Sequence, residues 1–522
     1  MRDFQRPGRS AVYAGNGMCA TSHPLAAQEA VRILQAGGNA VDAAIAGAVL
    51  LGVCEPHMTG IGGDCFALVA RPGEPIAAVN GSGRAPASAD AQAMRDAGHE
   101  VMPLNAPHAV TVPGAIDGFC TLSDRWGKLG LDASLAPAIR YFDEGVPVAP
   151  RVANDWAGLT GALQGAAREH FLSGGHAPSV GDRFRLPGQA EVLRRVAAKG
   201  RAAFYEGEVA EDMISALAAA GHTGEDFAAS KTSLGEPISG QYAGATLSEH
   251  PPNGQGATAL LLLNILSHFD LASLDPFGAE RVHLEAEATK LAYDARNRFM
   301  ADPDHTARLD HMLSMETAKR LAALIEPDRA LPSPTEASEA VHRDTVYITV
   351  VDRDRMAVSL IYSIFHGFGS GLASEKFGIL FQNRGAGFSL VPGHPNEYGP
   401  RKRPMHTIIP GHLAEPDGAT VPFGVMGGQY QSAGHARFVT NLRDFGLDLQ
   451  TALDAPRSFV EAGQLQLERG YDPALARTLA EKGHDVAEAP SAIGGAQAIR
   501  IRPDGVLEGA SDPRKDGCAI GH

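Results

Sequence analysis

The sequence predicts a large layered α/β protein, built either as two domains or as one extended domain. Its 522 residues exceed the size of one ordinary core, and 44% of them are hydrophobic, which is enough for substantial burial. Segments with helical periodicity also alternate with short β-branched segments along the chain.

The amino-terminal part contains two predicted helices followed by a hairpin. Residues 26–36 have apolar side chains at helical spacing and end at two glycines, and Asn39 with Asp42 can cap a second helix that runs to Val53. A glycine-rich loop at 55–66 then leads into strands predicted at 66–70 and near 76–79.

The middle of the chain is mainly helical, with predicted helices over 133–144, 189–198 and 280–300. Residues 327–344 are rich in Pro, Ser, Ala and charge without apolar periodicity, which predicts an exposed segment. An alternating β-branched strand begins abruptly at Thr345, and 357–364 is its predicted hairpin partner. The remaining third is predicted to be rich in strands.

Composition argues against several classes of function. The formal charge of −15 argues against nucleic-acid and anionic-membrane partners, which need a basic surface. The five cysteines and twenty histidines show no metal-ligand spacing, so we predict reduced thiols, no metal and no cofactor. The first 17 residues lack the apolar stretch of a signal peptide, and no window is apolar enough to span a membrane, which predicts a cytoplasmic protein.

Glycine motifs do not identify a nucleotide or esterase site. The sequence at 60–64 satisfies neither the dinucleotide pattern nor the P-loop pattern, and the segment at 367–371 has Gly369 where a nucleophile elbow needs serine.

Thr345 lies where a catalytic threonine would be released by cleavage. It follows a predicted exposed linker that ends in Asp344, and it begins a strand. A threonine hydroxyl is a weak nucleophile, and a freed α-amino group on the same residue would supply a nearby base. Taken alone, this local pattern favours an ordinary strand threonine.

Five ordered segments resemble the γ-glutamyltransferase (γ-glutamyltranspeptidase) family over nearly the whole chain. They are GGNAVDAAIA at 37–46, EPHMTGIGGDCF at 55–66, PPNGQGATALLLLNIL at 251–266, EATKLAYDARNRFMADP at 287–303 and DTVYITVVD at 344–352. The resemblance implies an N-terminal-nucleophile hydrolase with an αββα four-layer sandwich. It also implies self-cleavage between Asp344 and Thr345 into a large subunit, 1–344, and a small subunit, 345–522, which stay together. Whether two such heterodimers pair is left open.

The resemblance also implies roles for individual residues. Thr345 matches the nucleophile, whose freed amino group would act as general base. Ser363 stands where the family has a threonine that hydrogen-bonds the nucleophile. Gly427 and Gly428 match the glycines whose N–H groups form the oxyanion hole.

Several substrate-binding positions depart from the family pattern. The arginine that clamps the glutamyl carboxylate aligns with Ser82, so we predict that Arg84 reaches a carboxylate from a shifted position. The residues that hold the glutamyl ammonium group align with Phe365 and Gly387, and the second threonine of the family aligns with Val346. The paired serines become His406 and Thr407.

These departures predict a small acidic amide as the substrate, held by Arg84, His406, Thr407 and His366. Arg84 could instead be a plain surface arginine, and His366 could simply pack within its glycine-rich turn. The variant pattern resembles the branch of the family that contains oxamate amidohydrolases, so we expect hydrolysis of oxamate or a similar amide. The alternatives are γ-glutamyl hydrolysis or transfer, for example on glutathione, and a non-catalytic scaffold of the same fold.

Overall fold

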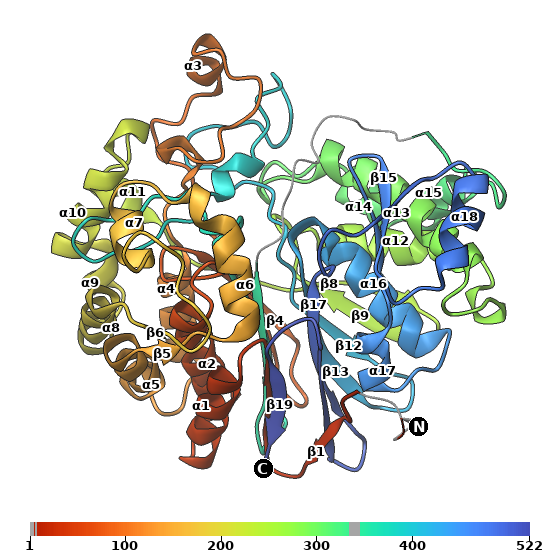
Figure 1. Ribbon diagram of the computed structural model, residues 1–522, viewed down its shortest axis with the longest axis horizontal. Coiled ribbons are helices and arrows are strands. Elements are labelled where there is room, and N and C mark those ends of the chain that lie inside the picture. Colours follow the sequence, from red (N-terminus) through yellow and green to blue (C-terminus); the bar gives the residue numbers. More distant parts are fainter. Residues whose placement is uncertain (1–4, 6–7, 333–344) are drawn as a thin grey trace.

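The computed structural model describes residues 5, 8–332 and 345–522 and has two stacked antiparallel sheets between two layers of helices (Figure 1). The first seven-stranded sheet has the order β19 (Cys518–Gly521), β2 (Met18–Thr21), β10 (Val346–Val351), β11 (Ala357–Ser363), β3 (Asp64–Ala70), β4 (Ala77–Gly81) and β7 (Ser233–Gly235). The second has the order β1 (Val12–Ala14), β18 (Leu507–Ser511), β17 (Gly495–Ile501), β13 (Thr420–Met426), β12 (Gly411–Ala414), β9 (Ala245–Glu249) and β8 (Ile238–Tyr242).

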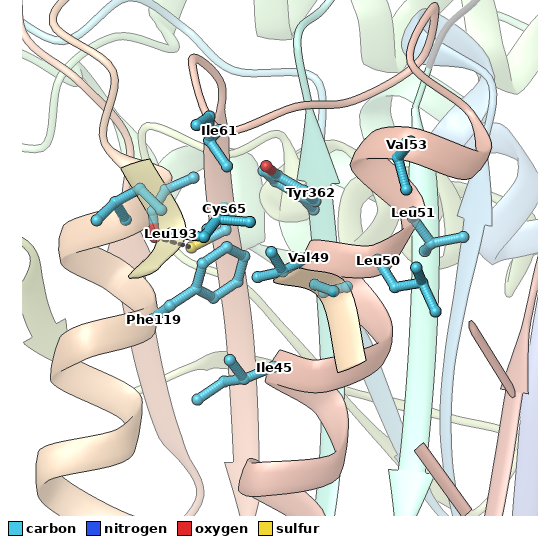
Figure 2. Close-up of a cluster of buried hydrophobic side chains, with 14 of the residues drawn as sticks. Ile45, Val49, Leu50, Leu51, Val53, Ile61, Cys65, Phe119, Leu193 and Tyr362 are labelled. Carbon is cyan, nitrogen blue, oxygen red and sulfur yellow. Dashed lines mark hydrogen bonds between the residues drawn. The ribbon is translucent and has the colours of Figure 1, made fainter. Parts of the chain in front are cut away.

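Helices from the first half of the chain cover the outer face of the first sheet. The helices α1 (Pro24–Gln35), α2 (Ala40–Cys54) and α4 (Ala115–Trp126) pack on its strands, and α5 (Leu131–Glu144) and α8 (Pro187–Lys199) form a further row. Helix α2 is buried along its whole length, which explains its nearly uniform apolar composition. Figure 2 shows Val49 of this helix beside Phe119, whose ring meets that of Tyr362 edge to face with centroids 5.2 Å apart.

The second sheet is covered by α12 (Gly256–Leu266), α16 (Gln431–Arg443) and α17 (Leu449–Asp454), with α13 (Ala279–Phe299) packed on α12. A small sheet of β14 (Ser458–Glu461), β15 (Gln464–Leu467) and β16 (Asp485–Glu488) packs near α13 and α18 (Pro473–Glu481). The shorter elements are α3 (Ala91–Asp96), β5 (Val146–Pro147), α6 (Pro150–Leu159), α7 (Ala166–Phe171), β6 (Arg183–Phe184), α9 (Ala202–Tyr205), α10 (Gly207–Ala216), α11 (Gly224–Ala229), α14 (Leu309–Leu313) and α15 (Met315–Ala322).

The two sheets face each other across a compact apolar layer. Phe66, Tyr347, Ile361, Ile408 and Met426 form its centre, and all five are fully buried. A hydrogen bond also joins the two sheets across this layer, from Ser359 Oγ on β11 to the carbonyl of Phe423 on β13 at 3.1 Å. The αββα sandwich expected from the sequence is therefore confirmed.

The hairpin that begins after Thr345 lies inside the first sheet and not at its edge. Strand β10 pairs with β2, and β11 pairs with β3, so both neighbours of the hairpin come from the first 70 residues. The parts before and after residue 345 thus share one sheet. The division into subunits 1–344 and 345–522 stays a prediction.

Most local predictions from the sequence are confirmed with shifts of a few residues. Asn39 and Asp42 form the expected capping box of α2. The strand expected near 76–79 is Ala77–Gly81, and the helix expected over 280–300 is Ala279–Phe299. Of the predicted linker, residues 333–344 lie outside the described residues, whereas Leu331 is held by a hydrogen bond from its N–H to Glu287 Oε2 of 2.7 Å.

Candidate active site

Thr345 lies between an inner strand of the first sheet and a helix that covers the second sheet. It directly precedes β10, and the β10–β11 register brings it beside Ser363, the last residue of β11. Its Oγ1 lies 3.3 Å from Ser363 Oγ and accepts a hydrogen bond of 3.5 Å from Gln431 Nε2 at the start of α16. The side chain is only 1% exposed. The structure therefore brings the predicted nucleophile and its predicted hydroxyl partner together.

A buried arginine that the sequence did not single out lies next to this pair. Arg384 Nη2 donates to Ser363 Oγ at 3.3 Å, and its Nη1 donates to Thr407 Oγ1 at 3.0 Å. The guanidinium also lies over the ring of Phe365, 4.0 Å from its centroid. Burial lowers the pKa of Arg384 to about 9, while the nearby charge of Asp64 opposes this shift. Arg384 is a cation at neutral pH, and it lies one side chain away from Thr345.

Phe365 adopts a backbone conformation that a bulky residue rarely tolerates. Its φ is +79°, which costs on the order of 1–3 kcal/mol for a non-glycine residue. The Phe365 N–H donates to Ser363 Oγ at 2.9 Å, so this strained turn is held by the same hydroxyl that faces Thr345. Strain of this kind is typical of functional sites, and here it holds an aromatic ring against Arg384.

Asp64 supplies the negative charge behind Arg384. Its Oδ1 accepts hydrogen bonds from the N–H groups of Gly83 at 2.9 Å and Gly114 at 3.2 Å. Burial raises the pKa of Asp64 to about 6, although Arg384 and the two N–H donors pull it down. Gly63, which precedes Asp64, lies close to β11, because a Cβ on it would come within 2.5 Å of the carbonyl oxygen of Ser363. Only glycine allows this close approach.

The predicted oxyanion turn follows β13 at the inner end of the same site. Gly427 and Gly428 have φ values of +118° and +54°, a left-handed turn that glycine adopts without strain. The carbonyl of Gly428 accepts a 3.2 Å hydrogen bond from Gln255 Nε2, which also donates to the carbonyl of Thr407 at 2.7 Å. Arg296 holds Gln255 in turn, through a 2.8 Å bond to its Oε1. The turn is thereby tied to the residues around Arg384.

Two of the predicted substrate-binding residues, His406 and Thr407, contact the Asp64–Arg384 cluster. His406 is fully buried, with Nε2 3.3 Å from Asp64 Oδ2, and burial next to Arg384 lowers its pKa well below the usual value. Thr407 is also buried and accepts from Arg384. The neutral imidazole of His406 and the hydroxyl of Thr407 therefore contact the acid and the arginine of this cluster.

Arg84 forms an ion pair with Asp302, and its role as a substrate clamp stays a prediction. Its Nη1 donates to Asp302 Oδ2 at 3.1 Å and to the carbonyl of Arg401 at 2.9 Å, and a third of its side chain is exposed. The carboxylate of Asp302 therefore compensates the charge of Arg84. The guanidinium that contacts the Thr345–Ser363 pair belongs to Arg384.

His366 packs beside Phe365. The His366 backbone N–H donates to Asn383 Oδ1 at 3.1 Å, and its half-buried ring packs edge to face on Phe365 with centroids 4.5 Å apart. His366 therefore borders the site through Phe365. Asp344, the predicted residue before the cut, lies outside the described residues.

One group of described residues offers metal ligands elsewhere in the fold. His283, Glu287 and His484 have ligand atoms within 4.8 Å of one another. His283 Nδ1 and His484 Nε2 already share a 2.8 Å hydrogen bond, and Lys290 Nζ donates to Glu287 Oε1 at 2.7 Å. These contacts fit a hydrogen-bonded network that anchors Leu331, since a metal ion would have to displace both of them.

A threonine that begins a central strand of two stacked sheets, with a paired hydroxyl and a glycine turn in front of it, is the arrangement of the N-terminal-nucleophile hydrolases. The model of the gamma-glutamyltranspeptidase family matches residues 26–522, so the chain belongs to this family.

Relatives with different names match nearly the whole chain. The oxamate amidohydrolase proenzyme of Klebsiella pneumoniae is 37% identical over 528 residues, covering 97% of this chain and 98% of that protein. The glutathione hydrolase-like YwrD proenzyme of Bacillus subtilis is 35% identical over 520 residues, with 97% and 98% covered. The crystal structure of cephalosporin acylase from Bacillus halodurans is 40% identical, covers 100% of this chain and 99% of that one, and has a TM-score of 0.92.

The names of these relatives, an amidohydrolase, a glutathione hydrolase-like protein and an acylase, together with the family match, support hydrolase or transferase activity for the chain described here. Within the described ranges, none of the helices combines the length and the apolar character that a membrane span requires. The cytoplasmic location stays a prediction.

Proposed function

We propose that this protein is a self-processing amide hydrolase that uses Thr345 to attack amides whose acyl group is small and bears a carboxylate, such as oxamate. The observation that carries this proposal is the position of Arg384, which donates to Ser363 Oγ beside the threonine hydroxyl and packs on Phe365. A planar guanidinium that is charged at neutral pH suits a carboxylate, which it can bind through two parallel hydrogen bonds.

The same arginine disfavours a γ-glutamyl head group. Phe365 aligns with a family position that holds the glutamyl ammonium group, and in this chain the Arg384 guanidinium lies over that ring. An ammonium group placed there would face a like charge in a buried environment, where repulsion is screened less than in water. The 37% identical oxamate amidohydrolase relative is in line with this choice of substrate.

Processing and catalysis would use the same hydroxyl. In the precursor, the Thr345 hydroxyl attacks the carbonyl of Asp344, its peptide nitrogen becomes an amino group, and water hydrolyses the resulting ester. The freed amino group of Thr345 then takes the hydroxyl proton as Oγ1 attacks the substrate amide. Charge on the amide oxygen is stabilised by N–H groups of the Gly427–Gly428 turn, a contribution of about 3–4 kcal/mol in comparable sites.

Collapse of this intermediate completes the reaction. The C–N bond breaks, the leaving nitrogen takes the proton from the Thr345 amino group, and an ester remains on Oγ1. Water, deprotonated by the same amino group, hydrolyses this ester and restores the hydroxyl. Ser363 positions Oγ1 throughout.

A side-by-side assay tests the proposal. Purified protein is first run on a denaturing gel, where fragments spanning 1–344 and 345–522 are expected. Ammonia release from oxamate and anilide release from a γ-glutamyl anilide are then measured. Faster turnover of the γ-glutamyl compound overturns the assignment of the acyl group, and a single uncut band without either activity favours the scaffold alternative.

A further inference from the structure

Three consecutive carbonyl groups of the predicted oxyanion turn accept hydrogen bonds. The Gly427 carbonyl accepts from the N–H of Tyr430 at 3.0 Å, and the Gly428 carbonyl accepts from Gln255 Nε2 at 3.2 Å. The carbonyl of Gln429 accepts from a tyrosine hydroxyl on α13. Two of the three donors therefore come from outside the turn.

Tyr293 supplies the hydroxyl that holds the carbonyl of Gln429. The residue is buried, and its ring packs edge to face on Phe459 with centroids 5.8 Å apart, so the ring keeps a contact of its own. Arg296 lies three residues further along α13, with its guanidinium 4.2 Å from the centroid of the Tyr293 ring. Residues at this spacing are neighbours on a helix surface. Helix α13 thus presents both side chains to the turn.

Arg296 supports the same turn through two side chains. Its Nη1 donates to the side-chain oxygen of Gln429 and, at 2.8 Å, to Gln255 Oε1. Because the oxygen of Gln255 accepts from Arg296, its Nε2 is directed at the carbonyls of Gly428 and Thr407. Arg296 is only 2% exposed, so bulk water does not compete for these bonds.

Glycine makes the turn easy to deform unless its peptide groups are held. Gly427 and Gly428 have φ values of +118° and +54°, and glycine reaches other conformations at little cost. A carbonyl is coplanar with the N–H of the next residue, so bonds to carbonyls also fix the direction of the N–H groups. The N–H of Gly427 belongs to the peptide of Met426, which β13 pairs with Gly495. The planes that follow depend on the bonds to the turn carbonyls.

We propose that Tyr293 and Arg296 are positioning residues for amide hydrolysis, because they hold the carbonyl side of a turn whose N–H groups stabilise the oxyanion. The inference rests on the proposed function, which gives the turn this role. It deepens that function by placing the support of a small-subunit turn on a helix of the predicted large subunit. The acyl side, around Arg384, keeps its own contacts. Loss of either positioning residue should therefore lower kcat and leave substrate binding nearly unchanged.

The first arm of the test removes one hydroxyl. We measure kcat and KM for oxamate per processed chain, counted from the small-subunit band of a denaturing gel. Removing an oxyanion donor outright costs about 100–1,000-fold in comparable sites, so loosening the turn should cost less. We expect Tyr293→Phe to lower kcat about tenfold and to change KM less than about twofold.

The matched control is Tyr242→Phe on β8. It also removes a buried hydroxyl, one that donates to Asp444 Oδ2 at 2.8 Å, and it should leave kcat within about twofold of the wild type. Equal values of kcat in the two phenylalanine variants overturn the proposal.

The second arm separates positioning from a general loss of structure. Carboxymethylboronic acid binds a hydroxyl as a tetrahedral anion and needs the oxyanion donors, whereas oxalate, the product of oxamate hydrolysis, is a ground-state ligand. Tyr293→Phe should raise the inhibition constant of the boronic acid about tenfold and that of oxalate less than about twofold. An unchanged constant for the boronic acid, or equal weakening of both inhibitors, overturns the proposal.

The third arm compares two buried arginines of α13. Arg296→Met removes the bonds to Gln255 and Gln429 and should lower kcat about 30-fold. Arg281→Met is the matched control, since Arg281 is fully buried and pairs with Glu285, and it should lower kcat less than about threefold. Thermal unfolding is measured for both variants, and the tyrosine pair decides alone if an arginine variant does not fold. Equal loss of kcat in two folded arginine variants overturns the proposal.

The two proposals fail in different ways. If γ-glutamyl anilides are turned over and oxamate is not, the acyl assignment fails, and the kcat comparison of the variants is made with the anilide. If Tyr293→Phe and the wild type hydrolyse oxamate equally well, the proposed function stands and the positioning role is wrong. A wild-type protein that hydrolyses neither compound overturns both.

Discussion

The two regions that meet at the Gly427–Gly428 turn differ in how they could recognise a substrate. Around Arg384 every cationic and acidic group is buried and already has partners, with Ser363, Thr407 and Asp64 arranged about one guanidinium. On the other side of the turn, a cavity of about 340 Å³ is lined by both cations and acids, namely Arg151, Lys515, Asp155 and Glu461. The difference indicates that the Arg384 side can recognise a substrate by a fixed, preorganised charge, whereas the cavity side offers mainly volume.

The largest expected effect comes from Thr345→Ala, which removes the group shared by both regions. We expect loss of both self-cleavage and hydrolysis, because alanine has no hydroxyl to act as the nucleophile at that position. A denaturing gel and an oxamate assay measure the two outcomes. Residual cutting at the normal position in this variant would contradict the assignment of the nucleophile.

Arg384→Met should reduce kcat/KM for oxamate by about 100-fold, because hydrogen bonds to a charged group contribute about 1.5–3 kcal/mol. The matched variant Arg84→Met should change it less than about threefold, since Arg84 pairs with Asp302. Measurement of kcat/KM for both variants separates the two arginines. A greater loss for Arg84→Met would restore the clamp predicted from the sequence. Thermal unfolding of each variant controls for misfolding.

Ser363→Ala should lower kcat about tenfold. The hydroxyl positions Thr345 Oγ1 and also accepts from Arg384 and the Phe365 N–H, so its loss loosens both the nucleophile and the acyl side. Ser363→Thr keeps the hydroxyl and should retain most of the activity. If alanine and threonine behave alike, the hydroxyl is not the reason for serine at this position.

The smallest effect concerns the pH dependence of stability. The pKa of Asp64 is raised to about 6, so the folded protein retains a proton there that the unfolded chain releases near pH 4. Stability should therefore fall as the pH rises from about 4 to about 6, by up to about 3 kcal/mol. Thermal melting of the uncut Thr345→Ala protein measures this slope, and Asp64→Asn in the same background should remove it. A slope of equal size with asparagine would show that other groups cause it.

The sequence predicts the fold well where local signals decide it. The capping box at Asn39 and Asp42 and the β-branched run after Thr345 depend on neighbours in the chain, and the structure places both as expected. The stacking of two sheets is not encoded in any such local pattern. It was available only through the resemblance to a family, because strand partners such as β2 and β10 lie far apart in the sequence.

The position of Arg384 could not be inferred from local sequence. Arginine in a glycine-rich loop is usually exposed, and only the distant Asp64, Ser363 and Thr407 make its burial possible. Arg84 also lies among glycines in the sequence, but it forms an ion pair with Asp302. The two arginines differ in their partners across the fold, which a single sequence does not display.

The central position of the β10–β11 hairpin also sets the order of events during biogenesis. Thr21 Oγ1 donates to the carbonyl of Tyr347, 326 positions further along the chain, so the first sheet cannot close until most of the protein has been synthesised. Closing so long a loop costs about 5 kcal/mol of chain entropy. If the chain were cut before residue 345 first, the two fragments would have to find each other as separate molecules. A cut that depends on Ser363 and Gln431 reaching Thr345 can occur only after the sheet has formed. If cleavage needs the folded site, the chain stays intact until the first sheet has formed.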